Sequence, residues 1–452
     1  MKQLLILSFL LAANTLIFGQ VNPKKCITTN LVENELLHNP DYIKGRANAI
    51  AENIAWMKAN NNMKNTTITI PIVVHVIHKN THANIGSGTN ISNAQIEDAI
   101  RILNEDFSKT NSEFPNPPRS TFLSYAGNPD LQFCLATVDP LGNSTSGVTR
   151  TSTSQADWDA DDDGPGGESN AMKQTAAGGI DSWDPSKYLN IWVCNLSNSQ
   201  GGGYTLGYAY LPGLQSWNAW KDGLVVDFQY FGTISAAATS DGRTPTHEIG
   251  HYLGLEHTFC PDTDPQGNYI CCDNDNTNSG GYVDDTPATQ GIYWYSVNST
   301  TNNNTCNDTQ YANIFTNDVL DMDENFMSYA STTWMFTSGQ SDVMHATLNG
   351  YRTNLKNSIT GGTTVNCGSV SIDDKLSNDI SIYPNPNSGT LFVSNAEKIN
   401  SIAITNMLGK SVYFTTKFNA NSLDLGGLQN GVYFININTN KGTYITKIIL
   451  AK

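Results

Sequence analysis

Three histidines and a glutamate lie within one short stretch of the chain and could bind and activate a metal. His247, Glu248 and His251 are followed by Gly254 and His257, which gives the pattern H-E-x-x-H-x-x-G-x-x-H. Histidines four residues apart on a helix project from the same face, one turn apart, as two zinc ligands require. Glu248 lies beside the first of them, where a carboxylate can take a proton from a water molecule that zinc activates.

The flanking residues predict how the third histidine reaches the same place. Pro245 suits the first position of a helix and Thr244 suits the cap before it, so a helix should begin just before His247. Gly254 can adopt a positive φ and turn the chain sharply, which would bring His257 back as a third imidazole. Three protein ligands leave one zinc position open for water, as in catalytic zinc sites. An amphipathic helix with incidental polar residues is the alternative, and five fixed residues at fixed spacing argue against it.

A second motif lies downstream of the histidines. The extended zinc motif resembles that of the metzincin clan of zinc peptidases, which also has a methionine turn beneath the metal. This chain has Met327 in the run NFMSY, and the stretch DENFMSYASTTWMFTSGQSDVM resembles the pappalysin family. The resemblance covers residues 68–358 and implies a zinc peptidase that cleaves proteins or peptides. It implies that Met327 supports the ligands and that Tyr329 points at the zinc and stabilises the oxyanion of the tetrahedral intermediate.

The elements around these motifs predict an α+β catalytic domain at 68–358. Residues 68–78 are rich in β-branched side chains and indicate a buried strand, and 91–107 has helical periodicity after Ser92. Further strands are expected at LQFCLATV, YLNIWVCNL, LGYAYLP and GLVVDFQYF, and a last helix at 339–357. With the resemblance, this predicts a metzincin-type fold with a twisted mixed sheet and a zinc-binding helix. Four other histidines are expected to be structural: His75, His78, His82 and His345.

The residues after the methionine turn bear on specificity. Pappalysin-like enzymes that prefer a basic residue after the scissile bond have an Asp there as the countercharge. Residues 330–334 of this chain are ASTTW and contain no acid. We therefore do not expect a strict preference for Arg or Lys, and hypothesise that Trp334 and Met335 make a more apolar pocket.

The first residues resemble a secretory signal, which we place at 1–20. Lys2 precedes an apolar run from Leu4 to Phe18 that is too short to span a bilayer comfortably. The rest of the sequence contains no apolar stretch of transmembrane length. The mature protein is therefore expected outside the cytoplasm, where disulfides persist.

Residues 21–67 are interpreted as a propeptide that keeps the enzyme latent as a zymogen. Ile50, Ile54 and Met57 are spaced like one apolar face of a helix. In the family, a cysteine near the start of the propeptide can bind the zinc, and Cys26 matches that position. A thiolate is a good zinc ligand and would displace the catalytic water. The alternative is a disulfide to a distant cysteine such as Cys367.

Two acidic loops are candidates for calcium. The run WDADDDGPGG at 158–167 has the start of a calcium loop, but Asn170 stands where the bidentate acid is needed. The run YVDDTP is the better candidate, because the family often binds calcium in this region and calcium prefers carboxylate and carbonyl oxygens. The expected ligands are Asp284, Asp285 and Thr286. An Asx-turn before Pro287 is the alternative.

Four of the eight cysteines lie in a polar, Asn-rich region that needs covalent cross-links more than a core does. Adjacent Cys271 and Cys272 rarely pair with each other, so two disulfides to Cys260 and Cys306 are expected, with the connectivity left open. Cys134 and Cys194 lie within apolar strands and should be buried, either free or paired.

The C-terminal part forms a separate module. Residues 359–378 have the composition of a linker, and 379–452 alternate like the strands of a small all-β sandwich. The Y-P-N-P-x-x-G start and the G-V-Y-F and K-I-I-L ends resemble the sorting domain of the bacterial type IX secretion system. That resemblance implies recognition by secretion machinery, export across an outer membrane and later removal of the tail. A carbohydrate- or surface-binding sandwich is the alternative.

The charge of the whole chain excludes one class of partner. The 25 basic and 41 acidic residues give a net charge of −16, and nucleic-acid binding needs clustered Lys and Arg. We expect a secreted, cell-surface or extracellular zinc endopeptidase made as a latent precursor, with calcium as a second candidate ion. The competing classes are a non-catalytic surface-binding protein on a metzincin fold and a zinc hydrolase of non-peptide amides.

Overall fold

The computed structural model describes residues 26–60, 67–161, 168–198, 204–260, 262–272, 283–311, 313–360, 382–394, 399–406, 410–416, 422–439 and 442–452. The chain divides into two compact units, Met1–Asn366 and Cys367–Lys452. The expected signal at 1–20, the end of the expected propeptide and most of the expected linker lie outside the described residues. Helix α6 (Thr353–Thr360) reaches just past position 359, where we placed the start of the linker.

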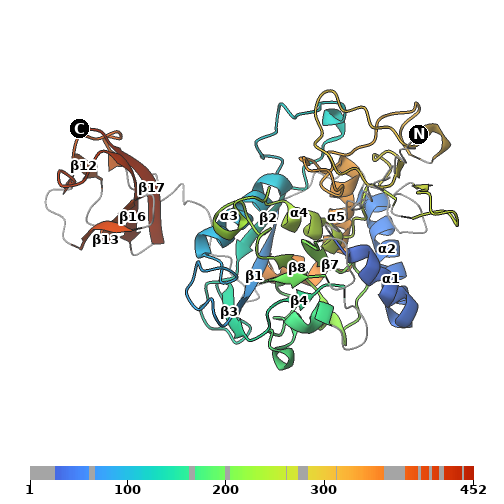
Figure 1. Ribbon diagram of the computed structural model, residues 1–452, viewed down its shortest axis with the longest axis horizontal. Helices are drawn as coiled ribbons and strands as arrows, with labels where there is room; N and C mark the ends of the chain where they lie inside the picture. The colour runs from blue at the N-terminus through green and yellow to red at the C-terminus, as the bar shows by residue number, and fades with distance from the viewer. Residues whose placement is uncertain are drawn as a thin grey trace, which may run out of the picture. The chain divides into compact units, whose positions relative to one another are not determined.

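A mixed sheet forms the centre of the first unit (Figure 1). Its strands lie in the order β2-β1-β5-β8-β7. Strand β3 pairs with the C-terminal half of β1, beyond the part that pairs with β2. All neighbours are parallel except β7, which runs antiparallel to β8 and forms an edge. The bounds are β1 Ile68–Lys79, β2 Leu131–Leu135, β3 Val148–Thr153, β5 Leu189–Cys194, β7 Gly207–Ala209 and β8 Leu224–Asp227. The expected strands and the mixed sheet are therefore confirmed.

Helices cover one face of this sheet and enclose the main core. They are α3 (Asn93–Phe107), α4 (Thr244–Tyr252), α5 (Ser338–Asn349) and α6. Ser92 caps α3 by accepting a hydrogen bond from the Gln95 amide, as its sequence predicts. Alternate residues of β1 pack against the buried faces of these helices, which places the active-site helix α4 directly on the sheet.

Short elements cover the other face and the rims. The cluster there includes Trp158, Met172, Trp192, Tyr208 and Val225. The remaining elements of the unit are β4 Trp158–Asp159, β6 Leu196–Ser197, β9 Cys271–Cys272, β10 Thr289–Gln290, and the 3₁₀ turns Leu123–Tyr125, Glu168–Lys173, Thr175–Ala177, Ala219–Lys221, Ser235–Ala237 and Asp308–Gln310.

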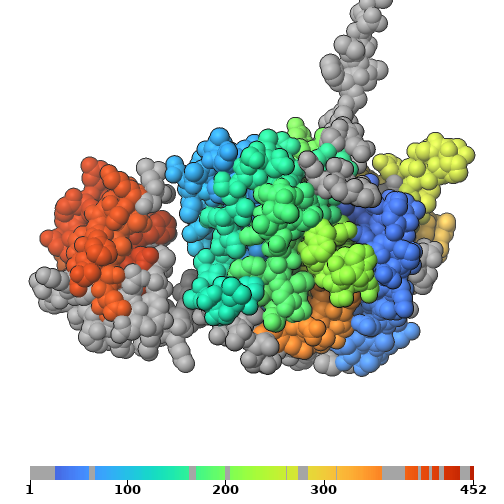
Figure 2. All heavy atoms as spheres, turned by 90° about the horizontal axis from the view of Figure 1, so that it is seen from below, coloured from blue at the N-terminus to red at the C-terminus, as the bar shows by residue number. Residues whose placement is uncertain are grey.

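Two N-terminal helices, α1 (Thr28–His38) and α2 (Pro40–Asn60), pack against the same unit. In Figure 2 they form the blue surface beside the orange residues near the end of the unit, in agreement with the contacts between α2 and α5. The helix expected between Arg46 and Met57 is confirmed within α2, but its predicted apolar face is only partly buried at Ile50, Ile54 and Met57, of which Met57 packs against the main core. The buried positions of α2 are Tyr42, Gly45, Arg46, Ala49 and Asn53. This helix docks through apolar contacts of Tyr42, hydrogen bonds of Arg46 and Asn53, and a close backbone approach at Gly45.

The second unit is all-β and is described by itself. Two antiparallel sheets, β11-β12-β15 and β14-β13-β16-β17, share one core that includes Leu391, Ile404, Leu423 and Ile435. The bounds are β11 Ile382–Tyr383, β12 Thr390–Val393, β13 Ile399–Asn406, β14 Ser411–Thr415, β15 Ser422–Asp424, β16 Gly431–Thr439 and β17 Gly442–Leu450. This confirms the predicted small β-sandwich. Among the described residues of both units, no helix is both long and apolar enough to cross a membrane.

Candidate metal centre and active site

One cluster of buried side chains has the composition and spacing of a metal site. A ligand atom from each of Cys26, His247, His251 and His257 lies within 4.8 Å of the others. The Nε2 atom of His257 is 3.1 Å from that of His251 and 3.2 Å from that of His247. Zinc–nitrogen bonds of about 2.0–2.1 Å in a tetrahedral site place two ligand nitrogens about 3.3 Å apart. The cluster therefore fits zinc by both donor type and distance.

Backbone carbonyls fix the orientation of the imidazoles. His247 donates from Nδ1 to the Phe326 carbonyl and His251 from Nδ1 to the Leu255 carbonyl, both over 2.7 Å. A ring that donates from Nδ1 has its lone pair on Nε2, which is the atom that faces the cluster. Nδ1 of His257 lies 3.3 Å from Oγ1 of Thr29 in the N-terminal segment.

Helix α4 and the turn after it bring the three histidines together. His247 and His251 lie one turn apart, and both are buried. Gly254 has φ of +100°, as predicted, and ends the helix so that His257 returns to the cluster. One detail of the prediction is wrong: the helix begins at Thr244, and Arg243 is the cap residue without a side-chain cap bond. Arg243 is held instead by Glu113, so its helix end is anchored through an ion pair.

Glu248 faces the cluster from the same helix and is fully buried. Its Oε2 atom is 3.3 Å from the Cys26 sulfur and 3.5 Å from Oγ1 of Thr28, while Oε1 has no hydrogen-bond partner among the described residues. Burial raises the pKa of Glu248 to about 8, and burial beside this carboxylate raises the pKa of the Cys26 thiol. A bound metal would act in the opposite direction on Cys26, because metal ligands bind deprotonated.

The methionine turn lies under α4. Met327 is fully buried, and a Cβ added to Gly250 of the helix would collide with its sulfur. The amide of Met327 donates to the side chain of Asn325, and the Met327 carbonyl accepts from Thr258, one residue after the third histidine. The turn therefore supports the helix and the third-ligand segment together.

The N-terminal segment occupies the front of this cluster. Cys26 forms a backbone bridge with Gly207, and the Thr28 hydroxyl donates to the Ala209 carbonyl over 2.9 Å, so both lie along the edge strand β7. Tyr329 donates from its hydroxyl to the carbonyl of Cys26 over 2.9 Å. Cys26 is a free thiol in the structure, so the alternative disulfide is wrong.

Helix α2 reaches the turn that carries the third histidine. Arg46 forms an ion pair of 2.8 Å with Glu256, which is adjacent to His257. Asn53 donates to Thr347 of α5 over 2.9 Å. Sequence reasoning missed both contacts, and the only signal was polar residues on an otherwise helical pattern. It also missed Thr28, whose signal was its position two residues after the thiol.

A cavity of about 280 Å³ opens beside Glu248 on the His247 side of the cluster. Trp334 and Met335 do not line it, so that hypothesis is wrong: both are fully buried in a separate core with Phe122 and Phe315. From this stretch, the smaller side chains of Ala330, Ser331 and Thr333 line the cavity instead. The lining residues are Leu206, Tyr230, Thr239, Ser240, Asp241, Arg243, Thr244, His247, Glu248, Phe326, Ser328, Tyr329, Ala330, Ser331 and Thr333.

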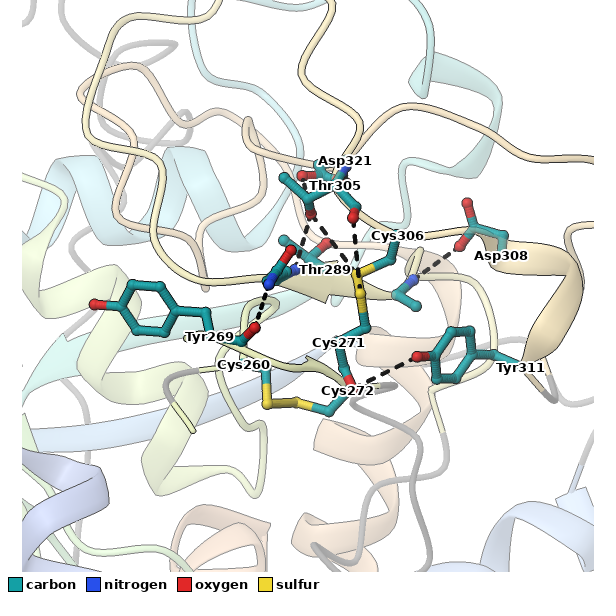
Figure 3. The surroundings of a disulfide bond; sticks show 12 residues. Cys260, Tyr269, Cys271, Cys272, Thr289, Thr305, Cys306, Asp308, Tyr311 and Asp321 are labelled. Carbon is teal, nitrogen blue, oxygen red and sulfur yellow. Dashed lines mark hydrogen bonds between the residues drawn. A yellow bond between two sulfur atoms is a disulfide. The ribbon is translucent and has the colours of Figure 1, made fainter. Parts of the chain in front are cut away.

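Two disulfides cross-link the polar region that follows the histidines (Figure 3). Cys260 pairs with Cys272 and Cys271 with Cys306, which settles the connectivity that the sequence left open. The expected burial of Cys194 is confirmed, and it is a free thiol. Cys134 is also buried and takes part in a disulfide.

The candidate calcium residues lie between this region and α5. Asp285 is buried and accepts hydrogen bonds from the Thr337 hydroxyl, over 2.6 Å, and from the Gly339 amide, over 2.8 Å. Asp284 is exposed, and the buried hydroxyl of Thr286 has no partner among the described residues. Asp285 therefore serves the start of α5. In the other loop Asp159 accepts from the Asp161 amide, and positions 162–167 lie outside the described residues.

Comparison with known proteins agrees with this geometry. The model of the pregnancy-associated plasma protein-A peptidase family matches residues 174–349. The structure of mature mirolysin from Tannerella forsythia with a cleaved peptide is 34% identical, with a TM-score of 0.54, over 66% of this chain and 99% of that one. The chain belongs to the pappalysin family. Pappalysins are zinc metallopeptidases of the metzincin clan, so the predicted family, fold class and metal are confirmed.

Three further proteins are similar to this chain: a precursor form of mirolysin and two extracellular metalloproteases. A variant of Tannerella forsythia promirolysin is 30% identical over 74% of this chain and 98% of that one, with a TM-score of 0.56. Extracellular metalloproteases of Pyricularia oryzae and Neurospora crassa are each 28% identical, over 53% and 68% of this chain. This chain spans 64% of the first relative and 84% of the second.

A secretion-system C-terminal sorting domain matches residues 381–451. With the extracellular relatives, this confirms a secreted pappalysin.

Proposed function

We propose that the chain is a zinc endopeptidase in which His247, His251 and His257 bind the metal and Cys26 keeps the precursor latent. The convergence of these four ligand atoms within 4.8 Å carries the proposal. Three of these ligand atoms come from one short stretch of the chain, and the fourth comes from the N-terminal segment. A structural zinc site would not need the adjacent buried glutamate and the cavity beside it.

Each neighbouring residue then has a role in peptide hydrolysis. Zinc supplies Lewis-acid activation at this site when it is bound. Glu248 accepts the proton of the attacking water and returns it to the leaving amine, since its carboxylate adjoins both the cluster and the cavity. Tyr329 donates its hydroxyl proton in a hydrogen bond to the developing oxyanion. Met327 and Gly254 hold the ligands in position and do not touch the substrate.

Latency follows from what the N-terminal segment covers. Cys26 occupies the remaining ligand position, its sulfur adjoins Glu248, and its carbonyl accepts from Tyr329. The segment thereby blocks the metal, the base and the oxyanion donor at once. The ion pair of Arg46 with Glu256 holds the segment in place at a second point.

Casein hydrolysis with and without a zinc chelator tests the activity. We expect cleavage after removal of the N-terminal segment, loss of cleavage with the chelator, and recovery on adding zinc. Protein that binds zinc and never cleaves casein or a peptide library would favour the non-catalytic surface-binding alternative. Turnover of small amides without peptide cleavage would favour the non-peptide hydrolase.

We further propose that residues 379–452 are recognised by secretion machinery and are removed after export. The sorting-domain match and the separate compact unit support this. The absence of nucleic-acid partners remains a prediction from charge.

Calcium near Asp284, Asp285 and Thr286 remains the second-ion proposal. Its support is one exposed carboxylate and one buried hydroxyl without a partner. Calcium titration of Asp284→Asn protein, with thermal stability as the readout, tests it: a calcium-dependent shift as large as in the wild type would remove this site.

A further inference from the structure

A wall of aromatic rings lies on the His257 side of the metal cluster. Phe259 stacks on the His257 ring with centroids 4.6 Å apart and 16° between planes. Tyr329 meets Phe259 at 4.7 Å, and Trp294 meets Tyr329 at 5.4 Å. Ile292 packs against the same group, so the rings form a continuous apolar surface that begins at a metal ligand.

This wall and the cavity share Tyr329 and otherwise consist of different residues. The cavity is lined by His247, Glu248 and Tyr329, and it includes none of His257, Phe259 and Trp294. Tyr329 is the residue that belongs to both surfaces. The cavity adjoins the cluster at His247 and the wall adjoins it at His257, so we infer that a peptide bound across the cluster contacts the cavity on one side of the scissile bond and the wall on the other.

Cys26 covers the wall in the latent chain. It packs into one hydrophobic cluster with Phe259 and Tyr329, and Thr29 of the same segment lies against His257. Phe259 and Tyr329 are each 4% exposed, whereas Ile292 and Trp294 are only partly buried. Departure of Cys26 therefore uncovers two ring faces next to a surface that solvent already reaches.

Backbone hydrogen bonds join the two halves of the wall, and a disulfide lies beside them. Cys260 follows Phe259 directly and pairs with Cys272 (Figure 3). The Cys260 amide donates to the Thr289 carbonyl, and the Cys260 carbonyl accepts from the Gly291 amide, which directly precedes Ile292. The polar, cross-linked region thus holds its few apolar side chains against the metal cluster.

We propose that Phe259, Ile292, Trp294 and Tyr329 form a substrate subsite for an apolar side chain. It takes the residue on the side of the scissile bond away from the cavity, and Trp294 is its main specificity determinant. None of the four side chains carries a charge, so a charged substrate residue would lose hydration there without gaining a partner. The inference rests on the proposed peptidase function and adds a substrate class to it.

Peptide-library digestion by the enzyme activated by removal of its N-terminal segment, read by mass spectrometry, tests the subsite. We expect the wild type to favour large apolar residues at one position on one side of the scissile bond. Trp294→Ala should lower kcat/KM for those peptides about tenfold and leave the preference at the cavity side unchanged. Trp294→Arg should shift the same position toward acidic residues, a gain that general damage cannot produce.

Tyr295→Ala is the matched control. Tyr295 is 73% exposed, and its ring contacts Tyr293 and not the wall. It should leave the profile unchanged. If both Trp294 variants are active and have the same cleavage profile as the wild type, the subsite is overturned and the peptidase function still holds. A wild type that cleaves no peptide after activation would overturn both.

Discussion

The hydroxyl of Tyr329 donates a 2.9 Å hydrogen bond to the backbone carbonyl oxygen of Cys26. Two residues 303 positions apart in the chain are thereby joined at the metal cluster. The acceptor is a peptide carbonyl, the same group that a substrate presents for attack. The N-terminal segment therefore engages the proposed oxyanion donor with the kind of oxygen that it binds during catalysis.

Tyr329→Phe should separate these two roles. In the activated enzyme we expect kcat to fall by about tenfold to a thousandfold with little change in KM, because the contact is strongest in the transition state. In the precursor the same change removes one bond that holds Cys26, so spontaneous activation should be faster. Steady-state kinetics and a time course of activation measure the two effects. A change confined to KM would contradict the catalytic role.

Glu248→Gln tests the general base. The amide matches the carboxylate in size, so fold and zinc content should be kept while activity falls by about 10²–10⁴-fold. Metal analysis and peptide hydrolysis on the same preparation provide the measurement. Wild-type turnover in protein free of contaminating protease would remove Glu248 from this role.

Cys26→Ala should yield a precursor that is active or processes itself, because water can occupy the vacated ligand position. Thiol-reactive mercurials should activate the wild-type precursor and have no further effect on this variant. Cys194→Ala is the matched control, since Cys194 is also a buried free thiol but is not part of the metal cluster. A Cys26→Ala precursor as silent as the wild type would mean that another group blocks the metal.

Deletion of residues 379–452 should leave a folded and active first unit when the host does not require the tail for export. The chain divides at Asn366, and each unit has its own core. Circular dichroism, zinc content and peptide hydrolysis of the truncated protein measure this. Insoluble or inactive protein would show that the sandwich is part of the catalytic fold.

Asp323 should make stability fall as pH rises. Burial and the nearby Asp321 carboxylate raise the pKa of Asp323 from 3.8 to about 7. The folded state then binds the proton more tightly than the unfolded state between pH 4 and 7, so raising the pH through that window destabilises it. Asp323→Asn should be more stable than the wild type at pH 8, by on the order of 1 kcal/mol, and lose this advantage below pH 4.

Urea unfolding in calcium-free buffer at pH 4, 6 and 8 gives the comparison. Asp318→Asn, in the same segment but exposed, is the control and should follow the wild type. If the difference in free energy of unfolding between Asp323→Asn and the wild type is the same at all three pH values, this carboxyl does not titrate as described.

The convergence of the three histidines could be predicted because its signal is local. His247 and His251 need one helical turn, and Gly254 needs only its own φ to return His257. The strands and α3 followed from periodicity for the same reason. The methionine turn needed the family resemblance, because nothing in the sequence around Met327 says which helix it will meet.

The contacts that could not be predicted join distant segments. Arg46 reaches Glu256 only once α2 has docked. The face of α2 that carries Arg46 docks partly through polar side chains, so the sequence shows no regular spacing of apolar residues along that face. The position of Trp334 after the methionine turn suggested a pocket residue, but its side chain is buried in a core with Phe122 and Phe315. Trp294 lies in a polar region whose disulfide connectivity sequence alone left open.

The contact between Gly250 and Met327 restricts which residues helix α4 can contain. Glycine within a helix costs roughly 1 kcal/mol relative to alanine, and α4 has only nine residues. Any larger residue at 250 would collide with the sulfur of Met327. The helix that carries His247 and His251 is therefore intrinsically weak as an isolated segment and is stabilised by packing against the sheet and against the turn beneath it. The side chains at positions 250 and 327 compete for the same space, so the effects of substitutions at the two positions on the free energy of unfolding should be non-additive. Alanine at 250 should be tolerated only with a smaller residue at 327.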